Sequence, residues 1–168
     1  MPKISGNSKP KQIDWKWEFP NDFCIIIDTR ENQMLFKRPP KGLLTVRDTL
    51  KIGDYSLKGF ETQITVERKN LDDFLQSISS GHKEFGKRLE KMNQYERKYL
   101  LIEGTENELL SPEPRLYSNI HPNVVRGALA SIWGKYNVPI YFAETRRHAE
   151  RWILDIFLRY FKWKRGIK

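Results

Sequence analysis

Two short apolar runs, set between segments of helical periodicity, constrain the fold of this chain most. Residues 23–28 (Phe-Cys-Ile-Ile-Ile-Asp) and 99–104 (Tyr-Leu-Leu-Ile-Glu-Gly) are strongly apolar and too short for buried helices. Such runs are typical of strands covered on both faces of a sheet. Apolar side chains recur at helical spacing after residue 70, after Pro122 and between Arg147 and about Phe161. We therefore expect an α/β sandwich built around a mixed sheet.

The finer divisions follow from turn signals and periodicity. Asn70 is a candidate N-cap for the first helix, and Pro122 is suited to the first turn of another. The apolar face of that second helix is expected to include Trp133. The other predicted segments are an extended strand continuing over 29–37, an ambiguous stretch at 43–50, strands at 55–57 and 63–67 around a turn at 58–61, a helix around 85–92, a loop over 105–120 and a strand at 138–142.

The length of 168 residues suits one domain with a substantial core. Residues 1–20 are polar, basic and aperiodic, so we expect a flexible basic arm, followed by a single domain over 21–168. Trp15, Trp17 and Phe19 alternate at the end of this arm. We expect them to dock on the domain, and the alternative is that they stack on nucleic-acid bases.

The chain is strongly basic, with 30 Lys and Arg against 21 Asp and Glu and a net charge of +9. This excess favours polyanionic partners, nucleic acid first and an acidic membrane surface second. The lone cysteine, Cys24, lies in an apolar run and excludes any disulfide within the chain. No stretch reaches the length of a membrane span and the N-terminus lacks the apolar core of a secretory signal, so we expect a soluble intracellular protein.

Acidic residues and a lysine cluster where the predicted strands end. Glu67 and Lys69 are two residues apart near the end of a strand, which places them on one face and sends Arg68 to the other. Asp54 follows Gly53 at the start of the preceding strand, so hairpin pairing brings it beside Glu67. Asp28 ends the first apolar strand, where an acid faces a cleft rather than the core.

These carboxylates supply the oxygen ligands that a hard divalent ion such as Mg²⁺ prefers. Such an ion activates water and neutralises charge during phosphodiester hydrolysis. Lys69, a compact cation on the same face, is suited to orient the attacking water or stabilise the developing negative charge. The sequence therefore predicts a metal-dependent nuclease site.

The ordered cluster Gly53-Asp54, Glu67-Arg68-Lys69 and Asp73 resembles the GD…ERKxxxD motif of the XPF-type structure-specific endonuclease domain. This family is a branch of the PD-(D/E)xK, restriction-endonuclease-like superfamily. The segment Ile27-Asp28-Thr29-Arg30-Glu31 resembles its Asp-x-Arg-Glu stretch, and the likeness covers roughly residues 23–160. It implies a three-layer restriction-endonuclease-like sandwich and a Mg²⁺- or Mn²⁺-dependent DNA endonuclease of repair or recombination.

The resemblance also implies roles for individual residues. Asp28, Asp54 and Glu67 are expected to hold metal, Glu31 to be a nearby catalytic acid and Lys69 the catalytic lysine. Arg30 and Arg68 are expected to contact phosphate or hold the acids in place, and Asp73 to be a structural partner of Arg68 rather than a ligand.

Two departures from the family pattern affect these expectations. Family members often carry Gly-Arg after the first helix, where this chain has Gly81-His82; Lys83, Lys87 and Arg88 are candidates to replace that phosphate contact. Eukaryotic members usually carry a tandem helix-hairpin-helix module after the nuclease domain, for which the sequence to Lys168 has no room. Substrate preference is therefore not carried over from the family.

The expected substrate is branched, flap or fork DNA. One alternative is a non-catalytic DNA-binding or scaffold subunit of a nuclease complex, and another is a junction-resolving or restriction-type nuclease. A homodimer through the nuclease domain is a further expectation. The basic residues between Arg146 and Lys168 indicate either a solvated helix face or a surface that follows a DNA backbone. The expected compartment is the cytoplasm or nucleoid for a prokaryotic or viral protein and the nucleus for a eukaryotic one.

Overall fold

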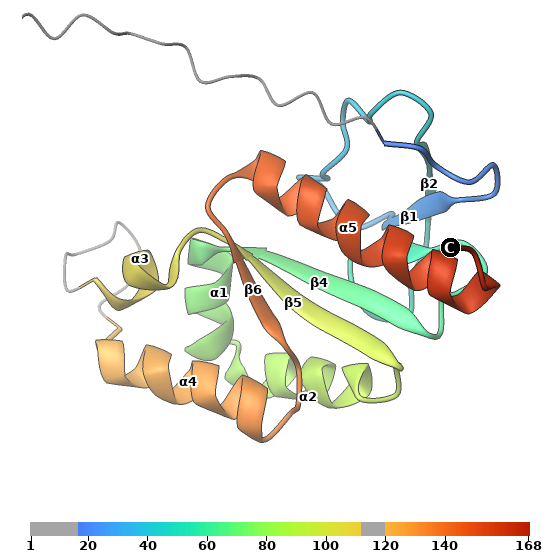
Figure 1. The fold of residues 1–168 in the computed structure, drawn as a ribbon. Helices are drawn as coiled ribbons and strands as arrows, with labels where there is room; N and C mark the ends of the chain where they lie inside the picture. Colours follow the sequence, from blue (N-terminus) through green and yellow to red (C-terminus); the bar gives the residue numbers. More distant parts are fainter. Residues whose placement is uncertain (1–16, 112–119) are drawn as a thin grey trace, which may run out of the picture.

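The computed structural model describes residues 17–111 and 120–168, which form a mixed six-stranded sheet with helices on both faces (Figure 1). The strand order is β2-β1-β3-β4-β5-β6. This arrangement confirms the predicted α/β sandwich. The elements are β1 Cys24–Asp28, β2 Leu44–Asp48, β3 Tyr55–Leu57, β4 Ile64–Asn70, α1 Leu71–Ile78, α2 His82–Met92, β5 Arg97–Glu103, α3 Glu106–Leu110, α4 Pro122–Gly134, β6 Ile140–Ala143 and α5 Arg146–Arg165.

The sheet changes strand direction at β3. Strands β1 and β2 run parallel to each other, and β4, β5 and β6 also form a parallel set. β3 pairs antiparallel with both β1 and β4, so it joins the two parallel sets. The predicted hairpin of residues 55–67 is confirmed, and it lies in the middle of the sheet.

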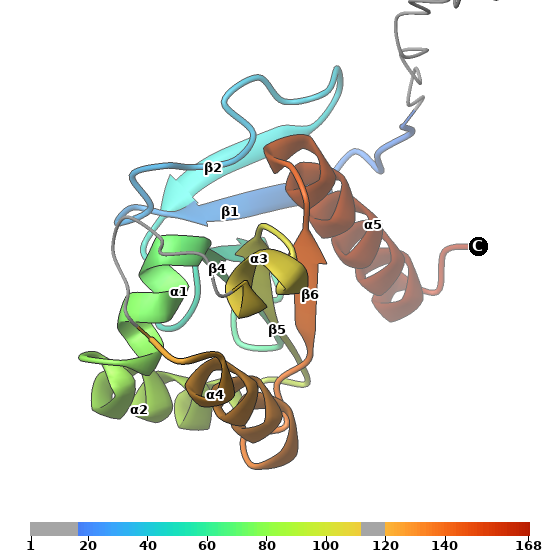
Figure 2. The ribbon, with the colours of Figure 1, turned by 90° about the vertical axis from the view of Figure 1, so that its left-hand side faces the viewer.

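Two apolar clusters hold the three layers together. α5 covers one face of the sheet, where Phe157 and Phe161 pack with Ile25, Tyr55 and Val66. The helices α1, α2 and α4 lie together on the opposite face (Figure 2). Across the described ranges, no helix combines the length and the hydrophobicity that crossing a bilayer requires.

Local signals set several of the helix starts. The side chain of Asn70 accepts a hydrogen bond from the backbone N–H of Asp73, so the predicted N-cap of α1 is confirmed. Pro122 occupies the first turn of α4, as expected. Thr145 caps α5, which begins at Arg146 and continues beyond the predicted end to Arg165.

Three predictions about local structure were wrong. Residues 29–37 form turns instead of a strand, because the N–H of Leu35 donates to the Tyr55 hydroxyl and that of Phe36 to the Glu150 carboxylate. The expected loop of 105–120 contains α3, started by a capping box at Thr105; residues 112–119 lie outside the described ranges. Trp133 is 62% exposed rather than part of the apolar face of α4.

The end of the N-terminal segment packs on the domain. Trp17 stacks on Phe19, which stacks on Phe23 at the start of the fold. Trp17 and Phe19 both contact the apolar cluster beneath α5. Docking is therefore confirmed for these two aromatic residues, while Trp15 and the rest of residues 1–16 lie outside the described ranges.

Candidate active site

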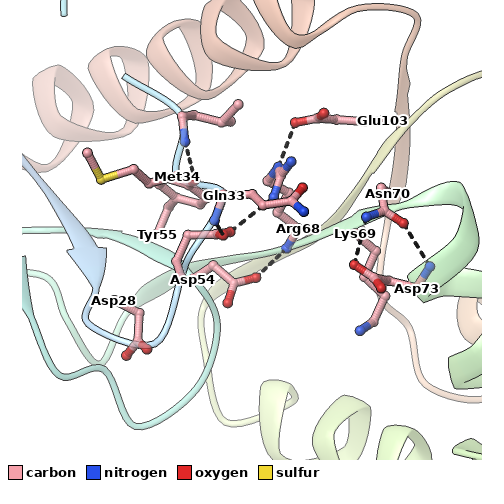
Figure 3. A network of polar contacts seen from close by, with 12 residues as sticks. Asp28, Gln33, Met34, Asp54, Tyr55, Arg68, Lys69, Asn70, Asp73 and Glu103 are labelled. Atoms are coloured by element: carbon pink, nitrogen blue, oxygen red, sulfur yellow. Dashed lines mark hydrogen bonds and ion pairs between the residues drawn. The ribbon is translucent and has the colours of Figure 1, made fainter. Parts of the chain in front are cut away.

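The register of three adjacent strands aligns the three predicted ligand carboxylates. The pairings of β1 with β3 and of β3 with β4 make Asp28, Asp54 and Glu67 neighbours in one row across the sheet. The backbone N–H of Asp28 donates to the Asp54 carbonyl at 2.8 Å, and that of Asp54 to the Val66 carbonyl at 2.8 Å. Figure 3 shows Asp28 and Asp54 close together. We call Asp28, Asp54 and Glu67 the acidic row.

Gly53 makes the turn that delivers Asp54 to this row. Its φ of +85° lies in the left-handed region, and a Cβ at this position would lie 2.0 Å from the Thr65 hydroxyl oxygen. Only glycine satisfies both conditions without rearrangement. The Gly-Asp dipeptide thus has a structural reason: the glycine allows the close approach of the chain to β4, and the aspartate that follows faces Glu67.

The predicted division of β4 into two faces is confirmed. Lys69 Nζ lies 3.7 Å from Glu67 Oε1 and 5.1 Å from the ring centroid of Phe85 in α2, on the α1–α2 side. Arg68 points the other way, and its Nε donates to Glu103 at 2.6 Å (Figure 3). The backbone N–H of Arg68 also donates to Asp54 Oδ2 at 2.7 Å, which fixes that carboxylate.

Two of the predicted site residues lie away from the acidic row. Glu31 lies on the Arg68 side of β4, where its Oε2 accepts a hydrogen bond from Arg68 at 3.2 Å. Asp73 is in the first turn of α1 and accepts a hydrogen bond from the Asn70 side chain. The expected pairing of Asp73 with Arg68 is therefore wrong, because Arg68 is turned toward Glu31 and Glu103 on the opposite face.

Two arginines hold the outer members of the acidic row. Arg30 contacts both oxygens of Asp28, at 2.7 and 3.0 Å, and also donates to the Leu50 carbonyl. Arg88 of α2 contacts both oxygens of Glu67, at 2.8 and 2.9 Å. Arg30 uses two nitrogens, one for each oxygen, which is the stronger form of the arginine–carboxylate ion pair, whereas Arg88 reaches both oxygens with a single nitrogen.

An open pocket with a volume of about 620 Å³ adjoins the acidic row between α1, α2 and the segment that precedes β3. Its walls carry the acids Asp73 and Glu84, and Lys87 pairs with Glu84 at 2.9 Å. Cations outnumber these acids. The cationic side chains that line it are Arg30, Lys51, Lys69, Lys87, Arg88 and Lys91. We call this space the basic pocket. Lys83, which the sequence suggested as a phosphate contact, is not among the residues that line it.

The pKa values of Asp28 and Asp54 are shifted in opposite directions. Burial alone raises the pKa of Asp28, but hydrogen bonds from the Arg30 side chain and from the Leu50 and Arg30 backbone outweigh it and lower the pKa below its usual value. Burial and then the negative charge of Glu67 raise the pKa of Asp54 to about 8, despite the hydrogen bond from the Arg68 backbone. Asp54 thus lies where negative charge lacks compensation.

The chemistry of this donor set fits a divalent cation. In residues 17–111 and 120–168, no three acidic, histidine or cysteine side chains converge closely enough to surround an ion, and Asp28 and Glu67 each accept hydrogen bonds from an arginine. The row nevertheless offers hard carboxylate oxygens on adjacent strands. A cation beside Asp54 would supply the positive charge whose lack raises the pKa of that carboxyl group.

Replacing Asp54 with asparagine is expected to stabilise the metal-free protein at pH 8 by about 2–4 kcal/mol. The pKa of Asp54 is about 8 in the folded protein and about 3.9 when unfolded. Folding therefore favours the protonated carboxyl group. The contribution of Asp54 to the free energy of unfolding is fully present below the unfolded pKa and is lost as the pH rises through 8. Urea denaturation with EDTA at pH 4, 6 and 8 measures the difference, and an equal gain at all three pH values would contradict the assignment.

Some residues of the site were missed by sequence reasoning. Glu103 ends β5 and holds Arg68, and Lys51 and Lys91 line the basic pocket. The signal for Glu103 was available, because an acid that ends a strand parallel to β4 lies at the same edge of the sheet as Arg68. Lys51 and Lys91 gave no such signal, since isolated lysines are common on any surface.

The basic residues of the C-terminal helix are partly engaged within the fold. Arg146 donates to the Met34 carbonyl, Lys164 pairs with Glu96 at 3.0 Å, and Arg165 pairs with Asp22 at 3.2 Å. Trp163 is 58% exposed. These contacts explain part of the basic cluster without DNA, and the choice between a solvated face and a DNA-binding surface stays open.

The fold is that of the XPF nuclease domain. XPF from Aeropyrum pernix, in complex with DNA, aligns with a TM-score of 0.61 at 22% identity, over 84% of this chain and 66% of that one. Another structure of XPF from Aeropyrum pernix aligns with a TM-score of 0.62 at 20% identity, over 86% and 64% of the two chains. The three-layer α/β sandwich with a central mixed sheet, expected from the sequence, is thereby confirmed.

The chain belongs to the ERCC4 domain family, whose profile matches residues 27–156. Among curated proteins, the putative ATP-dependent RNA helicase MJ1505 of Methanocaldococcus jannaschii is 30% identical over 132 residues, which are 79% of this chain and 15% of that protein. The DNA repair endonuclease UVH1 of Arabidopsis thaliana is 32% identical over 108 residues, 62% of this chain and 11% of that protein. The chain thus matches only a small part of each relative.

Proposed function

We propose that this chain is a divalent-metal-dependent endonuclease that hydrolyses phosphodiester bonds in branched, flap or fork DNA. The observation that carries the proposal is the acidic row, with Lys69 on the same face and the basic pocket beside it. Membership of the ERCC4 domain family and the names of the relatives, a DNA repair endonuclease and an XPF–DNA complex, support it.

In this proposal Asp28, Asp54 and Glu67 hold Mg²⁺ or Mn²⁺, which when bound activates water and neutralises charge on the phosphate. Lys69 presents its ammonium group on the same face as Glu67, where it orients the nucleophile or stabilises the negative charge that develops on the phosphate oxygens. Arg30 holds Asp28 in place, and the basic pocket attracts the phosphate backbone.

Arg68 has a different task. With Glu31 and Glu103 it forms a buried ion-pair cluster on the α5 side, and its backbone N–H fixes the Asp54 carboxylate. It therefore positions Asp54 and does not reach the reacting phosphate. The same contacts give Glu31 a supporting place beside Arg68, in contrast to the acids of the row.

The test is a cleavage panel of linear, nicked, flap, fork and four-way DNA of matched length, with Mg²⁺, Mn²⁺ or EDTA. We expect metal-dependent cleavage, with at least one branched substrate cut about tenfold faster than linear duplex. Equal rates on all substrates would leave a nuclease without structure preference and contradict the substrate assignment. No cleavage of any DNA in either metal would contradict the catalytic proposal.

Calorimetric titration with Mn²⁺ separates the enzyme from a non-catalytic scaffold. We expect saturable binding to the wild-type chain that Asp54→Asn abolishes, because this substitution removes one charged oxygen donor from the centre of the row. Salt-sensitive DNA binding without any Asp54-dependent binding of Mn²⁺ would instead indicate a scaffold subunit.

A further inference from the structure

Arg88 and Glu67 form an ion pair whose two members differ in freedom to move. The Glu67 side chain is 2% exposed and fixed within β4, whereas the Arg88 side chain is 45% exposed on α2. The two oxygens of Glu67 accept hydrogen bonds from a single nitrogen of Arg88, at 2.8 and 2.9 Å. If the pair opens, Arg88 is therefore the partner that moves.

The guanidinium of Arg88 contacts both oxygens of Glu67, the atoms with which this carboxylate would bind a metal ion. Both carboxylate oxygens are engaged, and the other nearby cation, Lys69, is farther away at 3.7 Å. A buried carboxylate without a cation is costly, so Arg88 supplies charge compensation in the metal-free protein. A divalent ion and Arg88 compete for the same oxygens, since two cations in contact with them repel each other.

Arg88 also lines the basic pocket, where a phosphate group could be its partner instead of Glu67. It lines the basic pocket together with Lys87 and Lys91 of the same helix and with Lys51 from the segment before β3. Glu84 lies one turn earlier on α2 and is already paired with Lys87 at 2.9 Å. A released guanidinium therefore enters a cation-rich space, where a phosphate group is the favoured ligand.

We propose that Arg88 exchanges partners during substrate binding: it pairs with Glu67 in the metal-free protein and contacts a DNA backbone phosphate in the basic pocket once a divalent ion takes that carboxylate. This rests on the proposed function. It couples the two ligands, because metal binding frees a cation for DNA, and by linkage DNA strengthens metal binding to the same extent.

The experiment compares Arg88→Met, which keeps much of the side-chain stem, with the neighbouring Lys87→Met, which removes the same charge without touching Glu67. Mn²⁺ affinity is measured by calorimetry without DNA. We expect Arg88→Met to tighten Mn²⁺ binding about fivefold to tenfold, because a competing cation is gone. We expect Lys87→Met to stay within about twofold of wild type, because Lys87 pairs with Glu84 rather than with the row.

DNA affinity is measured by fluorescence anisotropy with a labelled flap substrate in Ca²⁺, with intact DNA verified on a gel. We expect Arg88→Met to bind DNA in Ca²⁺ about fivefold to tenfold more weakly than wild type. We also expect the increase in DNA affinity on adding Ca²⁺ to be smaller for Arg88→Met than for wild type, by a similar factor. A role confined to stabilising Glu67 predicts weaker metal binding as well. The opposite signs for metal and DNA are therefore the signature of the exchange.

Unchanged or weaker Mn²⁺ binding by Arg88→Met, or unchanged DNA affinity in Ca²⁺, overturns the proposal. Arg88→Lys provides a second variant that keeps the charge, and the exchange predicts values between those of wild type and Arg88→Met. Failure of the wild-type chain to bind Mn²⁺ in an Asp54-dependent manner would overturn the proposed metal site itself, so the two failures are distinguishable.

Discussion

Replacing Glu67 with glutamine is expected to lower metal-dependent DNA cleavage by about a hundredfold to a thousandfold. The substitution keeps the volume of a side chain that is only 2% exposed, so the core of β4 is undisturbed. It removes the negative charge at the end of the acidic row and turns an acceptor into an amide donor. That donor faces Lys69 and Arg88, which have no lone pair to accept it. Single-turnover cleavage of the best substrate in Mg²⁺ measures the loss.

The matched control is Glu84→Gln, which makes the same change of charge within the basic pocket. Glu84 is 79% exposed, pairs with Lys87 and lies outside the acidic row. We expect its cleavage rate to stay within about threefold of wild type, since exposed ion pairs contribute little. Equal losses for the two variants would show that general pocket charge, and not Glu67 as a ligand, controls the rate.

The parts of the fold that the sequence predicted are those set by local patterns. The apolar run before Asp28, the hairpin leading to Glu67 and the cap at Asn70 each depend on residues close together in the chain. The strand expected at 29–37 fails because its backbone groups pair with partners distant in sequence, such as Glu150. A periodic pattern in the sequence carries no information about such long-range contacts. At residues 29–37 the tertiary structure therefore overrides the local strand propensity.

In the candidate site too, the features set by local sequence were predictable and those set by long-range contacts were not. Alternation along β4 is enough to place Glu67 and Lys69 opposite Arg68. It cannot show which cation holds which acid, because Arg88 reaches Glu67 from a helix on another part of the chain. The family resemblance implied that Asp73 is the partner of Arg68, whereas the parallel pairing of β4 with β5 gives Arg68 Glu103.

Arg68→Met is expected to lower the free energy of unfolding by about 3–5 kcal/mol. The Arg68 side chain is 5% exposed and pairs with Glu31 and Glu103, whose side chains are 8% and 17% exposed. Burial alone would lower the pKa of Arg68, but the hydrogen bond to Glu103 and the charges of Glu103 and Glu31 raise it above its usual value. Methionine fills much of the space but leaves the carboxylates of Glu31 and Glu103 without their cation, and the charge of Glu31 already acts on Asp54.

Urea denaturation at pH 7 with EDTA measures this loss, with Lys87→Met as the control for removing an exposed cation. That pair has side chains 65% and 79% exposed, so we expect a change below about 1 kcal/mol. The triple variant with Arg68→Met, Glu31→Gln and Glu103→Gln separates charge from packing. If unpaired carboxylates cause the loss, neutralising them restores more than half of it, since an ion-pair cluster replaced as a unit costs little. If the triple variant is as unstable as Arg68→Met, the stabilisation comes from the shape and hydrogen bonding of the guanidinium, and the cluster acts as a rigid support for Asp54 rather than as charge compensation.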